Sequence, residues 1–529
     1  MARKLKSLTA LVLPLVMSAV LVACVPQTTP ESAPQSAPKP NAVVYGTTFQ
    51  PNTLNPITAP DIVSRSAIEM IFSGLVAAND KGELRPALGE SWEESADGKV
   101  WTFKLRHGVK WHDGQEFTAE DVKFTYDTVI DPNTKPTVAK SDYAGLQRVE
   151  VVDPYTVRFY LAQPNAAFLA RLVLGIAPKH LLQGQDLATA TFNRQPVGTG
   201  PFVLDSWVKG ESLTFKRNTD YFGEKPKVEK IVWKIVPDSS VLALQASNGE
   251  VDGAPVFNPK DAAALQSSGK LALHETLEGN TQISLQERNL LFQDVRVRQA
   301  LAYAIDTHAL IDAVLAGAAV PATSDILPSS WAYNPDVPTY EYDPSKAKAL
   351  LADAGWRPGS DGILTKDGKR FSMSLMTDAG HKVREQVMLA VRQYWGEVGI
   401  EVKASTQERN SFIFDRVLKG DFDAVLLQTA VQIDPDLSRR FHTKSIKNGQ
   451  NFLNYSNPKL DTLLEQALAT SDQQQRKQAY AAAQKILAED VPQICLFHPK
   501  TQYAFKSQLQ GIKPSPTNLF WNAEQWEWK

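Results

Sequence analysis

Hydrophobic and polar positions alternate clearly in the segment that follows a turn signal at Asp97-Gly98. Trp101, Phe103 and Leu105 take every second position, and the residues between them are polar. This two-residue period is typical of a strand with one buried face. The pattern therefore predicts a strand directly after the turn.

The same segment continues into a predicted helix. Thr118 has the features of a helix N-cap, with the acidic Asp121 three residues later. Phe117 and Val122 flank this cap in the positions of a hydrophobic staple. Asp131-Pro132 ends the helix, because proline cannot continue it. With a second turn at Asp113-Gly114, these residues predict a strand, two turns and a helix, and they indicate no catalytic chemistry.

The second half of the chain has a more helical pattern. N-caps are predicted at Asp294, Asp306 and Asp343, the last followed by proline at the first helical position. An amphipathic helix over residues 383–398 ends at a glycine and leads into a strand. Because helices and strands alternate as far as residue 490, we expect this half to be α/β with a substantially parallel sheet.

The length and composition place the chain among globular proteins. It has 529 residues, too many for one hydrophobic core, so two or more globular units are expected. Its contents of 43% hydrophobic and 22% charged residues are ordinary for a soluble globular protein. A formal net charge of -2 argues against a nucleic-acid partner.

The N-terminus has the features of a signal sequence over residues 1–23. Arg3, Lys4 and Lys6 precede an apolar run that is shorter than the ~20 residues a membrane-spanning helix needs. The run ends in small residues before Cys24, which resembles a bacterial lipobox. This resemblance implies cleavage before Cys24 and lipidation of its thiol. An ordinary signal peptide with an incidental cysteine is the alternative.

Residues 24–40 are rich in Pro, Ser, Gln and Thr and lack an apolar period, which predicts a lipidated cysteine followed by a disordered tether. The chain has two cysteines, and lipidation of Cys24 leaves Cys495 unpaired, so no disulfide is expected. The expected location is the cell envelope, either lipid-anchored to the outer face of the cytoplasmic membrane or periplasmic.

Many positions within residues 87–130 fit one known consensus. The matching residues are Trp92, Asp97-Gly98, Phe103, Leu105, Arg106, Gly108, Val109, Trp111, His112-Asp113-Gly114 and Phe117 to Val122. The segment resembles the extracellular solute-binding proteins of the peptide/nickel family, which deliver solutes to ABC importers. Further segments match in the family's order, including PVGTGPF at residues 196–202. The resemblance runs from about Val43 to Lys513.

The resemblance implies an α/β fold of the periplasmic-binding-protein type, with two lobes joined by a hinge and an extra subdomain in the N-terminal lobe. Hinge segments are expected near Leu285 and Cys495, and the lobes would close on the solute like a clamp. The expected boundaries are residues 41–75, 196–285 and 495–529 for lobe I, residues 76–195 for the extra subdomain, and residues 286–494 for lobe II.

The loop from Gln428 to Asp434 is a candidate ligand site. It follows a predicted strand, and ligands in open α/β sheets bind beyond the C-terminal ends of strands. By the resemblance, peptide-binding members hold the ammonium of the peptide with an aspartate in this loop, and Val431 stands at that position here. Gln432 and Asp434 remain polar. We expect Asp434 either to replace the missing aspartate or to cap a helix.

Five further residues are candidates for the cleft. Phe49 and Asn52 belong to a polar, turn-rich loop that reaches the ligand in the family. Trp331 and Tyr333 either line the cleft or fill a loop. Arg384 stands near the start of its helix, where some dipeptide binders of the family place an arginine for the peptide carboxylate. A solvated helix residue is the alternative for Arg384.

Three classes of function are considered for this chain. The first is a lipid-anchored receptor that captures di- or oligopeptides in an inter-lobe cleft and delivers them to a membrane ABC permease. The second is the same receptor for another solute, such as a nickel chelate, haem, an oligosaccharide or an opine. The third is a secreted hydrolase, for which the sequence lacks a G-x-S-x-G elbow, an H-E-x-x-H motif and a cysteine nucleophile motif.

The sequence predicts no catalytic residue, cofactor or metal site. Eight histidines occur, and His107 and His112 alone have ligand-like spacing. Both lie in the strand and helix segment and are interpreted as packing residues. The expected partners are a small solute, the ABC permease and, through the lipid, the membrane. We expect a monomer and no binding of nucleic acid.

Overall fold

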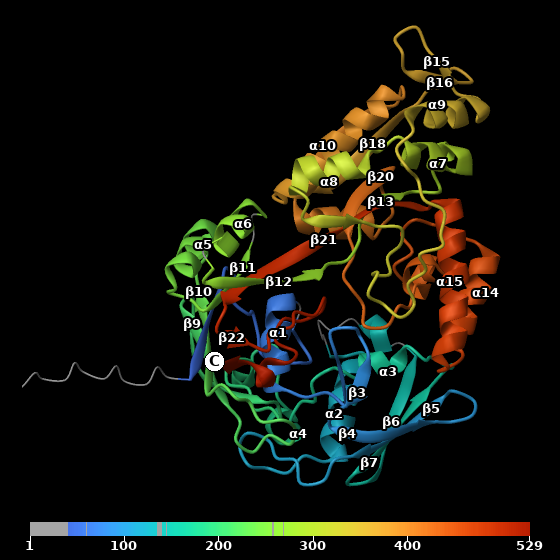
Figure 1. Cartoon of the computed structure of the whole chain (residues 1–529). Helices are drawn as coiled ribbons and strands as arrows, with labels where there is room; N and C mark the ends of the chain where they lie inside the picture. Colours follow the sequence, from blue (N-terminus) through green and yellow to red (C-terminus); the bar gives the residue numbers. More distant parts are fainter. Residues whose placement is uncertain (1–40, 60, 135–139, 144, 257–258, 268) are drawn as a thin grey trace, which may run out of the picture. The chain divides into compact units, whose positions relative to one another are not determined.

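The computed structural model describes residues 41–529 except 60, 135–139, 144, 257, 258 and 268 (Figure 1). The predicted signal sequence, the lipidation site Cys24 and the tether lie outside the described residues. Within the described part of the chain, none of the helices combines the length and the apolar character needed to cross a bilayer.

The largest sheet has twelve strands, and its first part surrounds the N-terminal strand. The strands of this part are β1 (Ala42–Thr47), β8 (Phe202–Val208), β9 (Ser212–Arg217), β10 (Lys230–Ile235) and β11 (Gly253–Val256). β1 is parallel to β10 and β11, whereas β9 is antiparallel to β8 and β10. The N-terminal strand therefore lies inside the sheet and not at its edge.

A separate four-stranded antiparallel sheet contains the segment with the alternating pattern. Its strands in spatial order are β4 (Gly89–Glu94), β5 (Val100–Leu105), β7 (Thr156–Leu161) and β6 (Leu146–Asp153). The predicted strand is confirmed as β5, in which Trp101 and Phe103 are buried. The two-residue period thus corresponds to a strand with one buried face.

The predicted helix is confirmed as α2 (Ala119–Ile130), which packs on β6. The hydroxyl of Thr118 accepts a hydrogen bond from a backbone N–H of the first turn. The carboxylate of Asp121 accepts one from the N–H of Thr118 at 3.0 Å. Phe117 and Val122 are fully buried, as a hydrophobic staple requires. These contacts fix the residue at which the helix begins.

The second part of the main sheet has both parallel and antiparallel pairs. Its strands in spatial order are β19 (Glu401–Gln407), β18 (Ser372–Asp378), β20 (Ala424–Gln428), β13 (Thr281–Leu285) and β21 (Gln493–Lys506). β18 is parallel to β19 and β20, which confirms the predicted parallel arrangement for three strands. β13 and β21 depart from it, because the chain enters this part along β13 and leaves it along β21.

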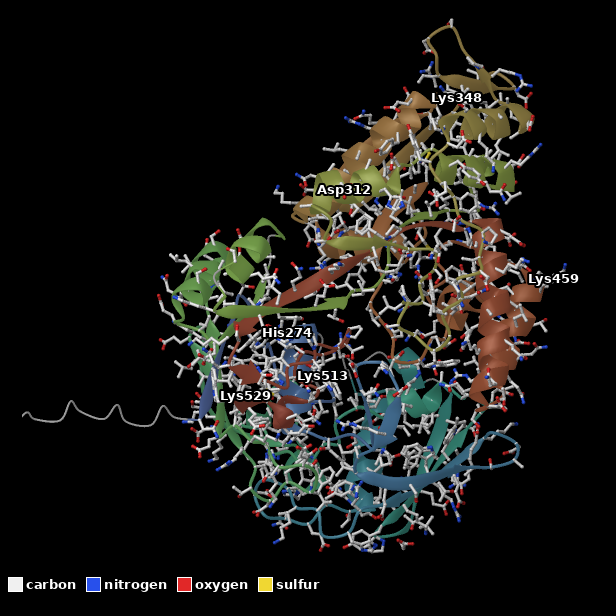
Figure 2. All side chains as sticks on the ribbon, viewed as in Figure 1. His274, Asp312, Lys348, Lys459, Lys513 and Lys529 are labelled. Carbon is white, nitrogen blue, oxygen red and sulfur yellow. The ribbon has the colours of Figure 1, made fainter. Side chains whose placement is uncertain are left out.

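The helices of this part begin at the predicted N-caps. Asp294, Asp306 and Asp343 each accept a backbone N–H from the first turn of the helix that follows. Lys348 and Lys459 point outward from their helices (Figure 2). The helices are α7 (Val295–Tyr303), α8 (Thr307–Leu315), α9 (Pro344–Asp353), α10 (Lys382–Glu397), α14 (Pro458–Leu468) and α15 (Gln473–Asp490).

Shorter elements complete the fold and supply several side chains of the candidate site. They include α1 (Ile62–Ile71), β2 (Val76–Ala78), β3 (Leu84–Pro86), α3 (Phe168–Arg171), α4 (Lys179–Leu182), α5 (Ser239–Asn248), α6 (Pro259–Ser267), β12 (Leu271–Leu277), β14 (Ala319–Pro321), α11 (Arg409–Ser411), α12 (Ser438–Phe441) and α13 (Ser445–Asn448). A short π-helix spans Phe412–Val417.

β21 is one strand of 14 residues that belongs to both parts of the main sheet, and it runs between them in Figure 1. Its first half pairs with β13, and its second half pairs with β12 and β11. The turn at residues 278–280 joins β12 to β13 beside it. Two adjacent stretches of chain therefore connect the two parts, as in a hinge.

The apolar cores of the two parts are separate. One core includes buried residues of β1, β5, α2 and β10, together with Phe505 and Trp526 near the C-terminus. A second core lies around β13, β18, α7 and α10, and a third is formed with α14 and α15. Among the described residues, no core cluster joins residues 76–195 to residues 286–494. Relative motion of these two regions therefore breaks no shared apolar core.

Candidate functional site

The candidate site lies at the C-terminal ends of the parallel strands β18 and β20. Residues 428–436, called the site loop below, begin at the last residue of β20 and continue beyond it at this edge. The N–H of Thr429 donates to the carbonyl of Asn280 at 2.9 Å, so the site loop lies against the turn at residues 278–280. A Cβ atom on Gly279 would lie 1.7 Å from the carbonyl oxygen of Thr429, which explains why glycine is needed there.

A turn of the predicted extra subdomain also approaches the site loop. Gly82 has a φ angle of +75°, and a Cβ atom there would lie 3.3 Å from the carbonyl oxygen of Ile433. The site loop therefore contacts both the turn at residues 278–280 and the region of residues 76–195. This position agrees with the rule that ligands of open α/β sheets bind beyond the C-terminal strand ends.

Gln428 is hydrogen-bonded to the turn at residues 278–280, called the hinge turn. Its amide nitrogen donates to Oε2 of Glu278, and the hydroxyl of Thr501 donates to Oε1 of the same carboxylate. The backbone N–H of Glu278 donates to the carbonyl of Pro499 at 2.8 Å. Glu278 thus links the hinge turn to β20 and β21, and sequence analysis did not identify it because no local motif surrounds it.

Asp434 is held by an arginine of α15. Its carboxylate lies 2.7 Å from the guanidinium of Arg476, and both side chains are largely buried, with exposed fractions of 13% and 8%. Burial by itself would lower the pKa of Arg476, but the Asp434 carboxylate outweighs this effect and raises that pKa. The charge of Asp434 is therefore neutralised within the protein.

The structure brings Trp331 into the same cluster. The guanidinium of Arg476 lies 5.3 Å from the centre of the Trp331 ring, which also packs 6.1 Å from the ring of Tyr480. Tyr333 is half-buried against the same core, and its N–H donates to the carbonyl of Ser330 at 3.1 Å. Trp331, Arg476 and Asp434 form one packed unit behind the site loop.

Arg384 is buried and paired. Its guanidinium donates to both carboxylate oxygens of Asp378, at 2.9 and 2.6 Å, and its exposed fraction is 7%. Arg409 lies 3.3 Å from the same carboxylate. Burial by itself would raise the pKa of Asp378, but the bonds and charge of Arg384 lower it. Arg384 is therefore not a solvated helix residue. Its guanidinium already has a carboxylate partner within the protein.

Phe49, Asn52 and Gln432 are more exposed. The side chain of Phe49 has an exposed fraction of 63%. The amide of Asn52 donates to Asp61 at 3.0 Å, beside the N-terminus of α1. Gln432 lies exposed in the site loop. Among the described contacts, none joins Phe49 or Asn52 to the site loop, so the assignment of these residues to the ligand stays a prediction.

A second set of charges crosses between residues 76–195 and residues 286–494. Arg171 lies 2.8 Å from Asp142 and 3.7 Å from Asp436, and Arg439 forms an ion pair with Asp142. We call these four residues the cross-lobe ladder. Sequence analysis missed the ladder because its members are distant in the chain and follow no motif. A cavity of about 210 Å³ lies beside Asp142 and includes Leu468 of α14 in its lining.

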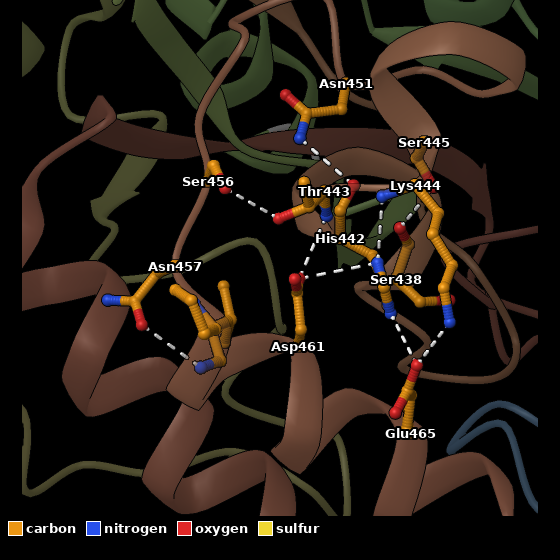
Figure 3. Close-up of polar contacts among 12 residues, drawn as sticks. Ser438, His442, Thr443, Lys444, Ser445, Asn451, Ser456, Asn457, Asp461 and Glu465 are labelled. Carbon is orange, nitrogen blue, oxygen red and sulfur yellow. Dashed lines mark hydrogen bonds and ion pairs between the residues drawn. The ribbon is translucent and has the colours of Figure 1, made fainter.

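The segment after the site loop is anchored on α14 (Figure 3). The Nδ1 atom of His442 accepts from the N–H of Lys444 at 3.0 Å, so Nε2 carries the proton toward Glu465, 3.2 Å away. Asp461 accepts from the N–H of Thr443 at 2.9 Å. These bonds fix the chain shortly after the site loop, whose other end is fixed by β20.

The described residues of the site supply groups that can bind a solute. Burial raises the pKa of the Cys495 thiol to about 12, so this free cysteine stays protonated at neutral pH. Among the described residues, no group of three His, Cys, Asp or Glu side chains is arranged to hold a metal ion. The groups at the site are amides, hydroxyls and charged side chains, which can orient a polar solute.

Comparison with known proteins identifies the family. A profile of the bacterial extracellular solute-binding proteins, family 5 Middle, matches residues 83–451. The oligopeptide-binding protein AppA of Bacillus subtilis (strain 168) is 34% identical over 496 residues, which cover 92% of this chain and 91% of that protein.

Solved structures give the same result. AppA from Bacillus subtilis in complex with a nonapeptide has a TM-score of 0.77 and 33% identity, covering 92% of this chain and 99% of that one. NikZ from Campylobacter jejuni in complex with Ni(L-His) has a TM-score of 0.77 and 28% identity, covering 93% and 100%. The predicted two-lobe α/β fold is confirmed by these similarities. The chain therefore belongs to the bacterial extracellular solute-binding proteins of family 5.

Proposed function

We propose that this protein is the receptor of an ABC importer for di- or oligopeptides. It captures a peptide between its two lobes and delivers it to the membrane permease. The observation that carries this proposal is the similarity to the oligopeptide-binding protein AppA, which extends over 92% of this chain. The boundaries given above for lobe I, the extra subdomain and lobe II are part of the same proposal.

The hinge and the separate cores support a clamp mechanism. The two parts are connected along β21 and along the turn at residues 278–280, and each part has its own apolar core. The site loop lies at this connection. Closure over a ligand would exclude water from the site and strengthen its polar contacts. Gln428 and Gln432 offer amide groups of the kind that bond a peptide backbone.

Another solute is the second candidate. The nickel-chelate protein NikZ has the same TM-score to this chain as the peptide protein AppA, so the fold alone does not select the ligand. Haem, an oligosaccharide or an opine would require the same clamp with different side chains at the site loop. The lower identity to NikZ, 28% against 33%, favours the peptide.

Ligand release and thermal stabilisation test this choice. The protein purified without refolding is denatured, and the released small molecules are identified by mass spectrometry. In parallel, the melting temperature is measured with a casein hydrolysate, with an oligosaccharide mixture and with nickel-histidine, because a ligand that binds the native state raises it. We expect peptides in the released fraction and stabilisation by the hydrolysate alone. Stabilisation by nickel-histidine alone would contradict the peptide assignment.

The anchor is a separate part of the proposal. We propose that Cys24 is lipidated and holds the protein at the outer face of the cytoplasmic membrane. Growth with a radioactive fatty acid should label the wild-type protein, whereas Cys24→Ala should be unlabelled and leave the membrane fraction. Cys495→Ala is the matched control, because the thiol of Cys495 is buried in the fold. Labelling of Cys24→Ala would contradict the anchor.

A further inference from the structure

The carboxylates at the C-terminal edge of β18 and β20 differ in how they are neutralised. Asp378 is paired with Arg384 and Arg409, and Asp434 is paired with Arg476. These two carboxylates have cationic partners inside the protein. They leave no unbalanced negative charge for a cationic group of a ligand.

Glu278 lies at the same edge and has neutral partners. Its carboxylate accepts hydrogen bonds from the amide of Gln428 and the hydroxyl of Thr501. Lys500 is on the next strand but pairs with Glu275 at 3.4 Å. Among the ion pairs of the described residues, none includes Glu278. A carboxylate has about four acceptor positions, so these two bonds leave it able to accept more.

Two titratable side chains interact electrostatically with Glu278. Burial lowers the pKa of His381, and the charge of Arg384 lowers it further, so the imidazole is neutral at neutral pH. Burial raises the pKa of Tyr503 to about 12, and the charge of Glu278 adds to this shift, so the phenol is neutral as well. Neither side chain supplies the positive charge that Glu278 lacks.

The position of Glu278 connects this charge to the ligand site. The turn at residues 278–280 joins the two parts and contacts the site loop through Thr429. We propose that Glu278 binds a cationic group of the ligand, an ammonium group of a peptide, where the turn at residues 278–280 meets the site loop. This assignment rests on the proposed peptide function and adds the charge that the ligand must carry. A charge-assisted bond in a half-buried site is stronger than a bond between neutral groups.

Chemical modification of one peptide pool tests the charge requirement. A casein hydrolysate is divided into an untreated pool, a fully acetylated pool without ammonium groups, and a reductively dimethylated pool that keeps its charge. Binding is measured by titration of the purified protein with each pool. We expect wild type to bind the untreated and dimethylated pools alike and the acetylated pool about tenfold more weakly or worse.

The variant Glu278→Gln keeps the shape and the acceptor oxygen but removes the charge. We expect it to bind all three pools with equal affinity, close to that of wild type for the acetylated pool. Glu275→Gln is the matched control, because Glu275 is exposed, precedes Glu278 by three residues and pairs with Lys500. It should keep the wild-type preference. A pool acetylated only at α-amino groups distinguishes the N-terminal ammonium from lysine side chains.

The outcomes separate this assignment from the proposed function. If wild type binds all three pools equally, or if Glu278→Gln keeps the preference for charged pools, the Glu278 assignment is overturned and the peptide function stands. If no pool binds wild type, the peptide function is overturned and the assignment with it. Circular dichroism of both variants establishes that they are folded before the titrations are compared.

Discussion

The guanidinium of Arg476 lies 2.7 Å from the carboxylate of Asp434, and this pair holds the end of the site loop against α15. Arg476→Met should lower the free energy of unfolding by about 3 kcal/mol, because it leaves a largely buried carboxylate without its cation. Urea unfolding measures this loss. Arg370→Met removes an exposed arginine that pairs with Asp361 and should cost less than about 1 kcal/mol. Equal losses in the two variants would contradict a structural role for the Asp434 pair.

The cross-lobe ladder should make closure depend on salt. The two ion pairs between the lobes, Arg171–Asp436 and Arg439–Asp142, are called its rungs. Each is partly exposed and stabilises the closed form by about 0.5–1 kcal/mol at low ionic strength, and salt weakens it. When the lobes separate, Asp142 keeps Arg171 and Asp436 keeps its bond from the N–H of Ser438 at 2.8 Å. Opening therefore breaks the contacts between the lobes without leaving either carboxylate unpartnered.

The double variant Arg439→Gln/Asp436→Asn removes both rungs without changing the net charge. In spin-labelled protein with labels at the exposed positions 110 and 459, wild type should shift to longer distances as salt rises. The double variant should show the longer distances already at low salt and respond little to salt. Arg416→Gln/Asp421→Asn removes a surface pair and is the control. A wild-type salt response in the ladder variant would contradict this prediction.

Gly279→Ala should destabilise the hinge turn. The new Cβ atom would lie 1.7 Å from the carbonyl oxygen of Thr429, so the backbone of the turn or of the site loop must move. We expect a loss of about 2 kcal/mol in the free energy of unfolding. Gly396→Ala in α10 is the control, because a Cβ atom there would meet no atom within 4 Å outside the backbone of its own helix. Alanine should stabilise that helix by up to about 1 kcal/mol.

Glu287 should make stability fall as pH rises. Burial raises its pKa from 4.5 to about 7, against the lowering effect of Arg298 and with a further rise from Asp490. The folded protein then holds this proton over a pH range in which the unfolded chain has lost it. The contribution of Glu287 to stability is therefore greatest below pH 4.5 and is lost as the pH rises to about 7.

Glu287→Gln should remove this pH dependence. The variant should match or exceed wild-type stability above pH 7, by up to about 3 kcal/mol, and its free energy of unfolding should change less between pH 5 and pH 8. Urea unfolding at a series of pH values measures the difference. Glu489→Gln, at an exposed position, is the control and should follow wild type. Parallel pH profiles for Glu287→Gln and wild type would contradict the assignment.

Sequence patterns located the elements better than the site. The start of α2 was predictable because Thr118 and Asp121 cap it locally, and β5 was predictable because alternation is a local signal. The antiparallel direction of β13 and β21 was not, because it depends on how the chain returns to the first part of the sheet. Local patterns contain no information about such long-range returns.

The ion-pair partners of the charged residues could not be predicted from the sequence either. The residue type alone does not show which arginine pairs with Asp434 or with Asp378, because tertiary packing places these arginines. Arg476, for example, is held in place by α15 and by the Trp331 ring. Glu278 has no motif around it, and its contacts with Gln428 and Thr501 join the turn at residues 278–280 to two strands, β20 and β21. Neutralised and unbalanced carboxylates look alike in a sequence and differ only in the fold.

The shared strand β21 has a consequence for biosynthesis. A nascent chain that ends before Gln493 lacks the strand between β11 and β13, and it also lacks Phe505 and Trp526 from the first core. Both halves of the polypeptide thus reach their final packing only when the last segment leaves the ribosome. Late completion would keep the newly made chain loosely structured until this last segment has been synthesised.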